Sequence, residues 1–134
     1  MILTLLACGP DLPEGWEDAE RVDDFTQAEC GDTGELALAA EAAGDDVALE
    51  VTHVGARCAQ DLEAFWQPAG DAAAEVLIQP VDMTPASVAK CDCAYDLAMV
   101  VPTPAPVTLE VWERGDEHAE EDPQPYLLGT VEAE

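Results

Sequence analysis

The chain contains few basic residues. Only four lysines and arginines stand against 30 aspartates and glutamates, which gives a formal net charge of −26. Nucleic-acid binding depends on lysine and arginine side chains that neutralise phosphates, so this composition excludes a nucleic-acid partner. It also excludes electrostatic docking on an anionic lipid surface. Because the acidic residues are spread over the whole chain, we interpret them as a solvated surface that keeps the protein soluble.

The chain is also poor in aromatic residues and in long apolar runs. Aromatic residues make up 5% of its 134 positions, and no segment approaches the roughly 18 apolar residues of a membrane-spanning helix. The motifs G-x-S-x-G and H-E-x-x-H and the phosphate-binding glycine-rich loops are absent. We therefore expect one domain built mainly on Val, Leu and Ile, with no enzyme activity and no cofactor.

Histidine is rare as well, with only two in the chain. His53 shares the alternation of Val47, Leu49 and Val51, which predicts an inward-facing, half-buried and hydrogen-bonded side chain near a strand end. His118 lies in a run of acidic residues that lacks the ordered spacing and the glycine of an EF-hand loop. We expect a solvated loop there and no metal site.

From residue 35 onward the dominant hydrophobic period is two. Val47, Leu49 and Val51 alternate with smaller or polar residues, and a Gly-Asp-Asp turn at 44–46 separates them from the apolar run before it. This pattern predicts a β-hairpin. The alternative is an alanine-rich helix over 35–43 that ends at the glycine, but a partner strand follows at once and favours the hairpin.

Further short segments predict the rest of a sheet protein. Segment 58–71 fits either a short helix or a strand, and the remaining strands are expected within 74–83, 91–101, 107–115 and 126–134. Trp112 is out of phase with the valines and leucine before it, so we expect it on the opposite face of its strand. The spacing of strands and Gly or Pro turns indicates an all-β fold, an antiparallel β-sandwich that is immunoglobulin-like in outline.

The N-terminus carries a short lipidation-like motif. Leu5, Leu6 and Ala7 precede Cys8, and this run resembles the lipobox of small exported bacterial lipoproteins. The resemblance implies cleavage before Cys8, a lipid on its sulfur and attachment to a membrane through that lipid. No basic residue precedes Arg21, although a secretory signal begins with one, so we expect an in-frame basic and apolar extension upstream of Met1.

The cysteine count agrees with this resemblance. Five cysteines are an odd number, and a lipid on Cys8 leaves Cys30, Cys58, Cys91 and Cys93, an even set suited to two disulfides. Residues i and i+2 of a strand lie about 6.6 Å apart, whereas the Cβ atoms of a disulfide lie about 3.8 Å apart. Cys91 and Cys93 should therefore not bond to each other. Each should bond to Cys30 or Cys58, in an order that the spacing leaves open.

These observations predict three segments: a signal-like segment at 1–7, an acidic and irregular lead-in at 8–34 and the β-sandwich domain at 35–134. We expect an exported, lipid-anchored binding or structural module of the bacterial cell envelope, on its periplasmic or outer-surface side. Its protein or glycan partner is not identified by the sequence. The alternative is a metal-binding envelope protein that uses Cys91, Cys93 and a histidine.

The strand 91–101 would place one set of side chains on the core side. Cys91, Cys93, Tyr95, Leu97, Met99 and Val101 all have one parity. This pattern predicts a central strand held to two other segments by disulfides.

Overall fold

The computed structural model describes residues 11–83, 92–116 and 122–134. This part of the chain contains nine β-strands and no helix. The strands are β1 (Glu20–Arg21), β2 (Phe25–Gln27), β3 (Ala37–Ala43), β4 (Asp46–Arg57), β5 (Leu62–Gly70), β6 (Ala73–Pro80), β7 (Asp92–Val101), β8 (Val107–Glu113) and β9 (Tyr126–Ala133). The prediction of an all-β protein is confirmed.

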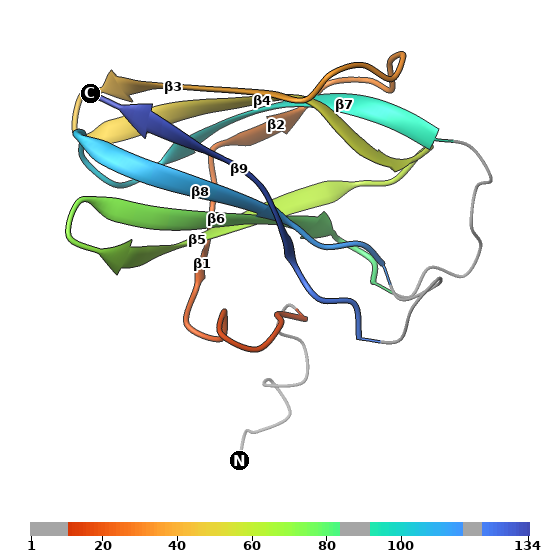
Figure 1. Ribbon diagram of the computed structural model, residues 1–134. Helices are drawn as coiled ribbons and strands as arrows, with labels where there is room; N and C mark the ends of the chain where they lie inside the picture. The colour runs from red at the N-terminus through yellow and green to blue at the C-terminus, as the bar shows by residue number, and fades with distance from the viewer. Residues whose placement is uncertain (1–10, 84–91, 117–121) are drawn as a thin grey trace.

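The strands form two sheets that pack face to face as a sandwich (Figure 1). One sheet has the order β1-β5-β6-β8-β9 and the other has the order β2-β7-β4-β3. All neighbouring strands are antiparallel except β6 and β8, which pair in parallel. The arrangement fits an immunoglobulin-like outline, with that parallel pair as a departure from the fully antiparallel sheets expected.

The alanine-rich segment before Gly44 is a strand. Every residue of β3 pairs with β4 from Ala37 opposite Thr52 to Ala43 opposite Asp46. Gly44 takes a φ of 68° in the turn, a left-handed conformation that glycine adopts without a steric cost. The pairing outweighs the helix propensity of alanine, as expected where a partner strand follows within two residues.

The core lies between the two sheets and contains the inward residues of six strands. The predicted inward face of β7 is confirmed for its described members Cys93, Tyr95, Leu97, Met99 and Val101, all buried. Cys91 lies outside the described residues. The exposed Asp92, Asp96 and Ala98 alternate with this set. Strand β7 is thus central in its sheet, between β2 and β4.

The prediction that His53 points inward is wrong. Strand β4 pairs with β7 through Val51 and again through Val54, and the extra residue on β4 forms a β-bulge. The bulge places His53 at a φ of 62° and makes Val54 the next core residue. The backbone N–H of His53 donates to the Asp96 carboxylate, and Nδ1 of the His53 ring lies 2.8 Å from the carbonyl oxygen of Glu35. The side chain is half-buried and hydrogen-bonded, as expected.

A second apolar layer lies on the outer face of the five-stranded sheet. Phe65 and Leu77 alternate away from the core but are 1% and 0% exposed, and the buried Trp16 also lies outside the main core. The segment that begins at Asp11 is bound to this face, because the backbone carbonyl oxygen of Asp11 accepts hydrogen bonds from the side chains of Gln79 and Arg114. The N-terminal lead-in therefore contributes both a covering segment and, further on, strands β1 and β2.

The edge strands β3 and β9 lie against each other and close one side of the sandwich. Gly129 of β9 lies at this approach, close to the side chain of Leu38. A Cβ atom at that position would lie 2.9 Å from Cδ1 of Leu38 on β3, which is closer than van der Waals contact. On the opposite side, the chain crosses from one sheet to the other. It leaves the five-stranded sheet after its edge strand β1 and enters the four-stranded sheet at its edge strand β2, a few residues later.

Candidate ligand-binding cleft

A cleft of about 520 Å³ opens at the end of the sandwich where β4 ends and β7 begins. Its walls come from both sheets. The main lining residues are Gly55 and Arg57 of β4, Gln60 of the following turn, Glu113 of β8, Asp116 after it, and Tyr126 of β9. The volume falls within the range of small-molecule sites in proteins, about 300–1,000 Å³.

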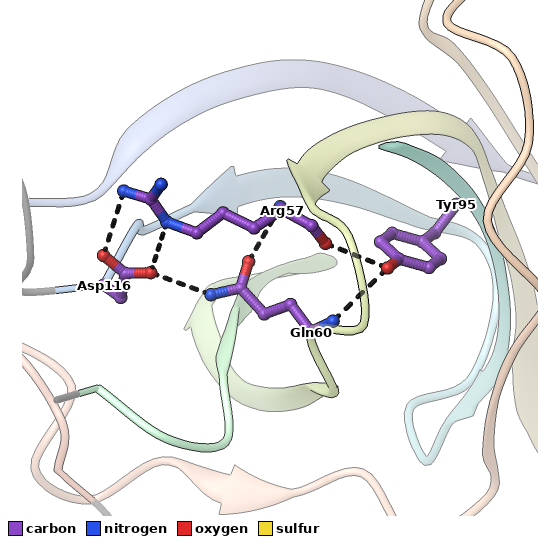
Figure 2. Close-up of polar contacts among 4 residues, drawn as sticks. All are labelled: Arg57, Gln60, Tyr95 and Asp116. Carbon is purple, nitrogen blue, oxygen red and sulfur yellow. Dashed lines mark hydrogen bonds and ion pairs between the residues drawn. The ribbon is translucent and has the colours of Figure 1, made fainter. Parts of the chain in front are cut away.

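A network of four residues holds the cleft walls together (Figure 2). Arg57 Nε donates to Asp116 Oδ2 at 2.8 Å, and Gln60 Nε2 donates to the same oxygen at 2.9 Å. The backbone N–H of Arg57 donates to Gln60 Oε1 at 3.1 Å. Tyr95 on β7 donates its hydroxyl hydrogen to the carbonyl oxygen of Arg57 at 2.9 Å. The network thus joins β4, the β4–β5 turn, β7 and the segment after β8.

The ion pair of this network is unevenly exposed. The Asp116 side chain is 2% exposed, whereas the Arg57 side chain is 30% exposed. A buried carboxylate is stable when a cation and hydrogen-bond donors satisfy its oxygens, and here Arg57 and Gln60 supply them. Asp116 therefore fixes the position of the one guanidinium that the cleft presents to solvent.

Glu113 is the second buried carboxyl of the cleft. It continues the inward parity of Val107, Leu109 and Val111, and the residue is 6% exposed. Burial raises its pKa from 4.5 to about 7, because a charged carboxylate loses hydration there, and the hydrogen bond from Tyr126 partly opposes this shift. The pKa of Tyr126 is raised by its own burial and by the negative charge of Glu113.

Arg114 also lines the cleft but serves as a structural clamp. It is 1% exposed and donates to the carbonyl oxygens of Pro123 and Asp11 and to Oε1 of Gln79. Its Nη2 lies 3.5 Å from Asp122. The guanidinium thereby joins the N-terminal segment, β6 and the segment before β9. Two backbone carbonyls and one side-chain amide oxygen converge on this cation, and these hydrogen bonds offset the cost of burying its charge.

Cys93 places a disulfide in the cleft wall. It is bonded to Cys30, which confirms the prediction that Cys93 reaches one of Cys30 and Cys58. Cys58 is also disulfide-bonded, and its Sγ lies 3.0 Å from Sγ of Cys93. Because Cys91 lies outside the described residues, its pairing with Cys58 stays a prediction. The same holds for the lipidation of Cys8.

The predicted histidine and tryptophan positions lie elsewhere. His53 is on the outer side of the β4 bulge and does not line the cleft, and His118 lies outside the described residues. Trp112 is on the outer face of the five-stranded sheet, in register with Leu77, as its phase predicted. Its indole N–H is buried and meets no acceptor in the part of the chain that the structure describes.

Sequence reasoning missed the polar residues of the cleft. Glu113 had a readable signal, because a carboxylate in phase with three core residues is an unusual inward position. Arg57 and Asp116 had none, since they are 59 residues apart and meet only through the sheet topology. The scarcity of cations in the chain makes it notable that two of the four line this one cleft.

Comparisons with known proteins do not place this chain in a family. No family model matches it, and neither a curated protein nor a solved structure shows detectable similarity. Among the described residues no helix has the length and apolar character needed to span a membrane. The function must therefore be argued from the cleft and the cysteines.

Proposed function

We propose that this protein is an exported, lipid-anchored binding module of the bacterial cell envelope, which holds a small ligand in the cleft. The observation that carries the proposal is the cleft itself, where polar side chains from both sheets converge in a cavity of ligand size. The lipobox-like run before Cys8 supports the anchor. The Cys30–Cys93 disulfide supports export, because such bonds persist in oxidising compartments.

The cleft is preorganised, which favours binding over a purely structural role. Arg57 and Gln60 are held by Asp116 and by backbone contacts before any ligand arrives. A site whose side chains are already ordered loses less conformational entropy on binding. We propose binding without catalysis, because Arg57 and Asp116 neutralise each other and the described histidine lies outside the cleft.

The anchor is tested by fractionation of the protein expressed from its gene with the upstream sequence. We expect the wild-type protein in the detergent-extracted membrane fraction and Cys8→Ser in the soluble fraction. Intact mass should show a lipid adduct on the wild type alone. Membrane retention that is unchanged by Cys8→Ser would refute the anchor.

The binding site is tested by blocking it. Gly55 lies two residues before Arg57 on the same side of β4, and a Cβ atom there meets nothing within 4 Å, so Gly55→Trp adds a bulky ring beside this guanidinium of the cleft. Thr130→Trp, at an exposed position of β9 outside the cleft, is the matched control. In a thermal-shift screen of amines, amino acids and sugars, we expect stabilisation of the wild type and the control but not of Gly55→Trp. Stabilisation of all three proteins would place binding elsewhere.

Metal binding is a second candidate, favoured by the sulfur cluster. The sulfur atoms of Cys30, Cys58 and Cys93 lie within 4.8 Å of one another. Thiolates bind metals and disulfide sulfurs do not, so this function requires chemical reduction of the disulfides. The reduced protein should then bind Co²⁺ with thiolate charge-transfer bands in the near ultraviolet. Absence of these bands while the protein stays folded would exclude the metal site.

A further inference from the structure

We propose that the cleft takes a ligand bearing an ammonium or guanidinium group, and that this group pairs with the carboxyl of Glu113. The inference rests on the proposed binding function and names its ligand class. A basic side chain of a peptide or a small primary amine has the required chemistry.

Glu113 is a buried carboxyl in the cleft wall. The residue is 6% exposed and lines the cleft, and its carboxyl accepts one hydrogen bond from Tyr126 at 2.9 Å. Among the described residues, no cation forms an ion pair with it. A buried carboxyl without a cation is costly to ionise, and it gains more than an exposed one when a cation arrives.

Both arginines that line the cleft already have acidic partners. Arg57 pairs with Asp116, and Arg114 is surrounded by carbonyl oxygens and Asp122. The charged groups that line the cleft are therefore two satisfied cations, the carboxylate of Asp116, the exposed Asp92 of β7, and Glu113 itself. Within residues 11–83, 92–116 and 122–134, Asp92 and Glu113 have no cationic partner, so a cation is the ligand charge that these two acids favour.

Tyr126 adds an aromatic contact. The residue is 54% exposed, lines the cleft and holds Glu113 through its hydroxyl. Cations are attracted to tyrosine rings within about 6 Å of the centroid. A ligand cation at Glu113 would thus have an aromatic ring and a carboxylate on neighbouring walls.

The charge of the whole protein favours the same ligand. With a net charge of −26, the long-range field attracts cations and repels anions before contact. The field and the engagement of both arginines disfavour an anionic ligand.

Binding should be coupled to the ionisation of Glu113. The pKa of about 7 leaves this carboxyl mostly neutral at pH 6 and mostly ionised at pH 8. A cation binds the ionised form, so the dissociation constant should fall roughly tenfold between these two pH values. Removal of the Tyr126 hydrogen bond raises the pKa further and should move this transition to higher pH.

The probe is the capped tripeptide acetyl-Ala-Lys-Ala-amide, compared with its norleucine analogue by calorimetry in 0.15 M NaCl. We expect binding of the lysine peptide alone, with the tenfold change between pH 6 and pH 8. Glu113→Gln should weaken binding and remove the pH dependence, whereas Tyr126→Phe should keep binding and shift the pH midpoint upward. Thermal denaturation of each variant checks that it is folded.

The matched control is Glu110→Gln on the same strand, which makes the same charge change outside the cleft. It should leave the affinity and its pH dependence unchanged. Equal weakening by Glu110→Gln and Glu113→Gln would overturn the inference, because only the general field would be acting. A second outcome is that the lysine peptide does not bind, whereas a neutral compound binds the wild type but not Gly55→Trp. That result would overturn the cationic ligand class and leave the proposed binding function standing. Failure of every ligand in the screen overturns both.

Discussion

The two ends of the sandwich are built in different ways. At one end, short turns connect β3 to β4 and β5 to β6, so each connection is made by residues adjacent in the sequence (Figure 1). At the other end lie the cleft, the Cys30–Cys93 disulfide and the network around Asp116, which are held mainly by bonds between residues distant in the sequence. The turn end depends on local backbone preferences, and the cleft end depends on long-range bonds.

The largest expected effect is loss of the disulfide at the cleft end. It closes a separation of 63 residues, and loop-closure entropy then predicts a stabilisation of about 4 kcal/mol. The double variant Cys30→Ala/Cys93→Ala should lose most of this free energy of unfolding in urea titrations. Wild-type protein under reducing conditions should fall to a similar or lower stability. A loss below about 1 kcal/mol would mean that the cleft end does not depend on this bond.

The next effect is removal of the network's carboxylate. Asp116→Ala leaves Arg57 and Gln60 without their acceptor in a partly buried site, which costs about 2–3 kcal/mol of unfolding free energy. Asp45→Ala, an exposed aspartate of the β3–β4 turn, is the control and should change stability by less than about 0.5 kcal/mol. Equal losses at the two ends would contradict the difference drawn between them.

The pH dependence of stability separates Glu113 from the general acidity. Its pKa is about 7 in the folded protein and 4.5 as an unperturbed carboxyl, so the folded state binds this proton more tightly. The resulting stabilisation, about 3 kcal/mol, is fully present below pH 4.5 and is lost as the pH rises through 7. Glu113→Gln should lack this loss in urea titrations between pH 5 and pH 8. Glu110→Gln should retain it, and a flat profile for the wild type would contradict the assignment.

The smallest effect concerns left-handed alanines at both ends. Ala59 in the β4–β5 turn and Ala72 in the β5–β6 turn have φ values of 58° and 53°. The left-handed conformation costs an alanine about 1 kcal/mol, and glycine avoids this cost but loses more entropy on folding. Ala59→Gly and Ala72→Gly should each stabilise by about 0.5 kcal/mol in thermal denaturation. If the two variants gain similar stability, the backbone strain at these turns does not depend on the long-range bonds of the cleft end.

The sequence predicted the sandwich because most of its strands bury one face. The alternation in β4 and β7 identified core residues such as Leu49 and Leu97 directly. Segment 58–71 was ambiguous for a physical reason: β5 is buried on both faces at Ala64 and Phe65, since the N-terminal segment covers the outer one. Strands buried on both faces lose their period of two.

The remaining errors and omissions depend on pairing rather than on composition. The bulge at His53 arises from the register between β4 and β7, which no local pattern encodes. The candidate cleft was not predicted because Arg57 and Asp116 meet only when β8 lies beside β6 at the end of the sandwich. The disulfide of Cys93 was predicted from spacing, but spacing alone did not select Cys30.

The clamp formed by Arg114 on Asp11 has a consequence for the geometry of the anchor. Only two residues separate Asp11 from Cys8, and three extended residues span at most about 11 Å. If the lipid proposed for Cys8 is attached, its attachment point lies within about 11 Å of Asp11, on the outer face of the five-stranded sheet. Under that proposal, the domain would stay within a short distance of the membrane surface.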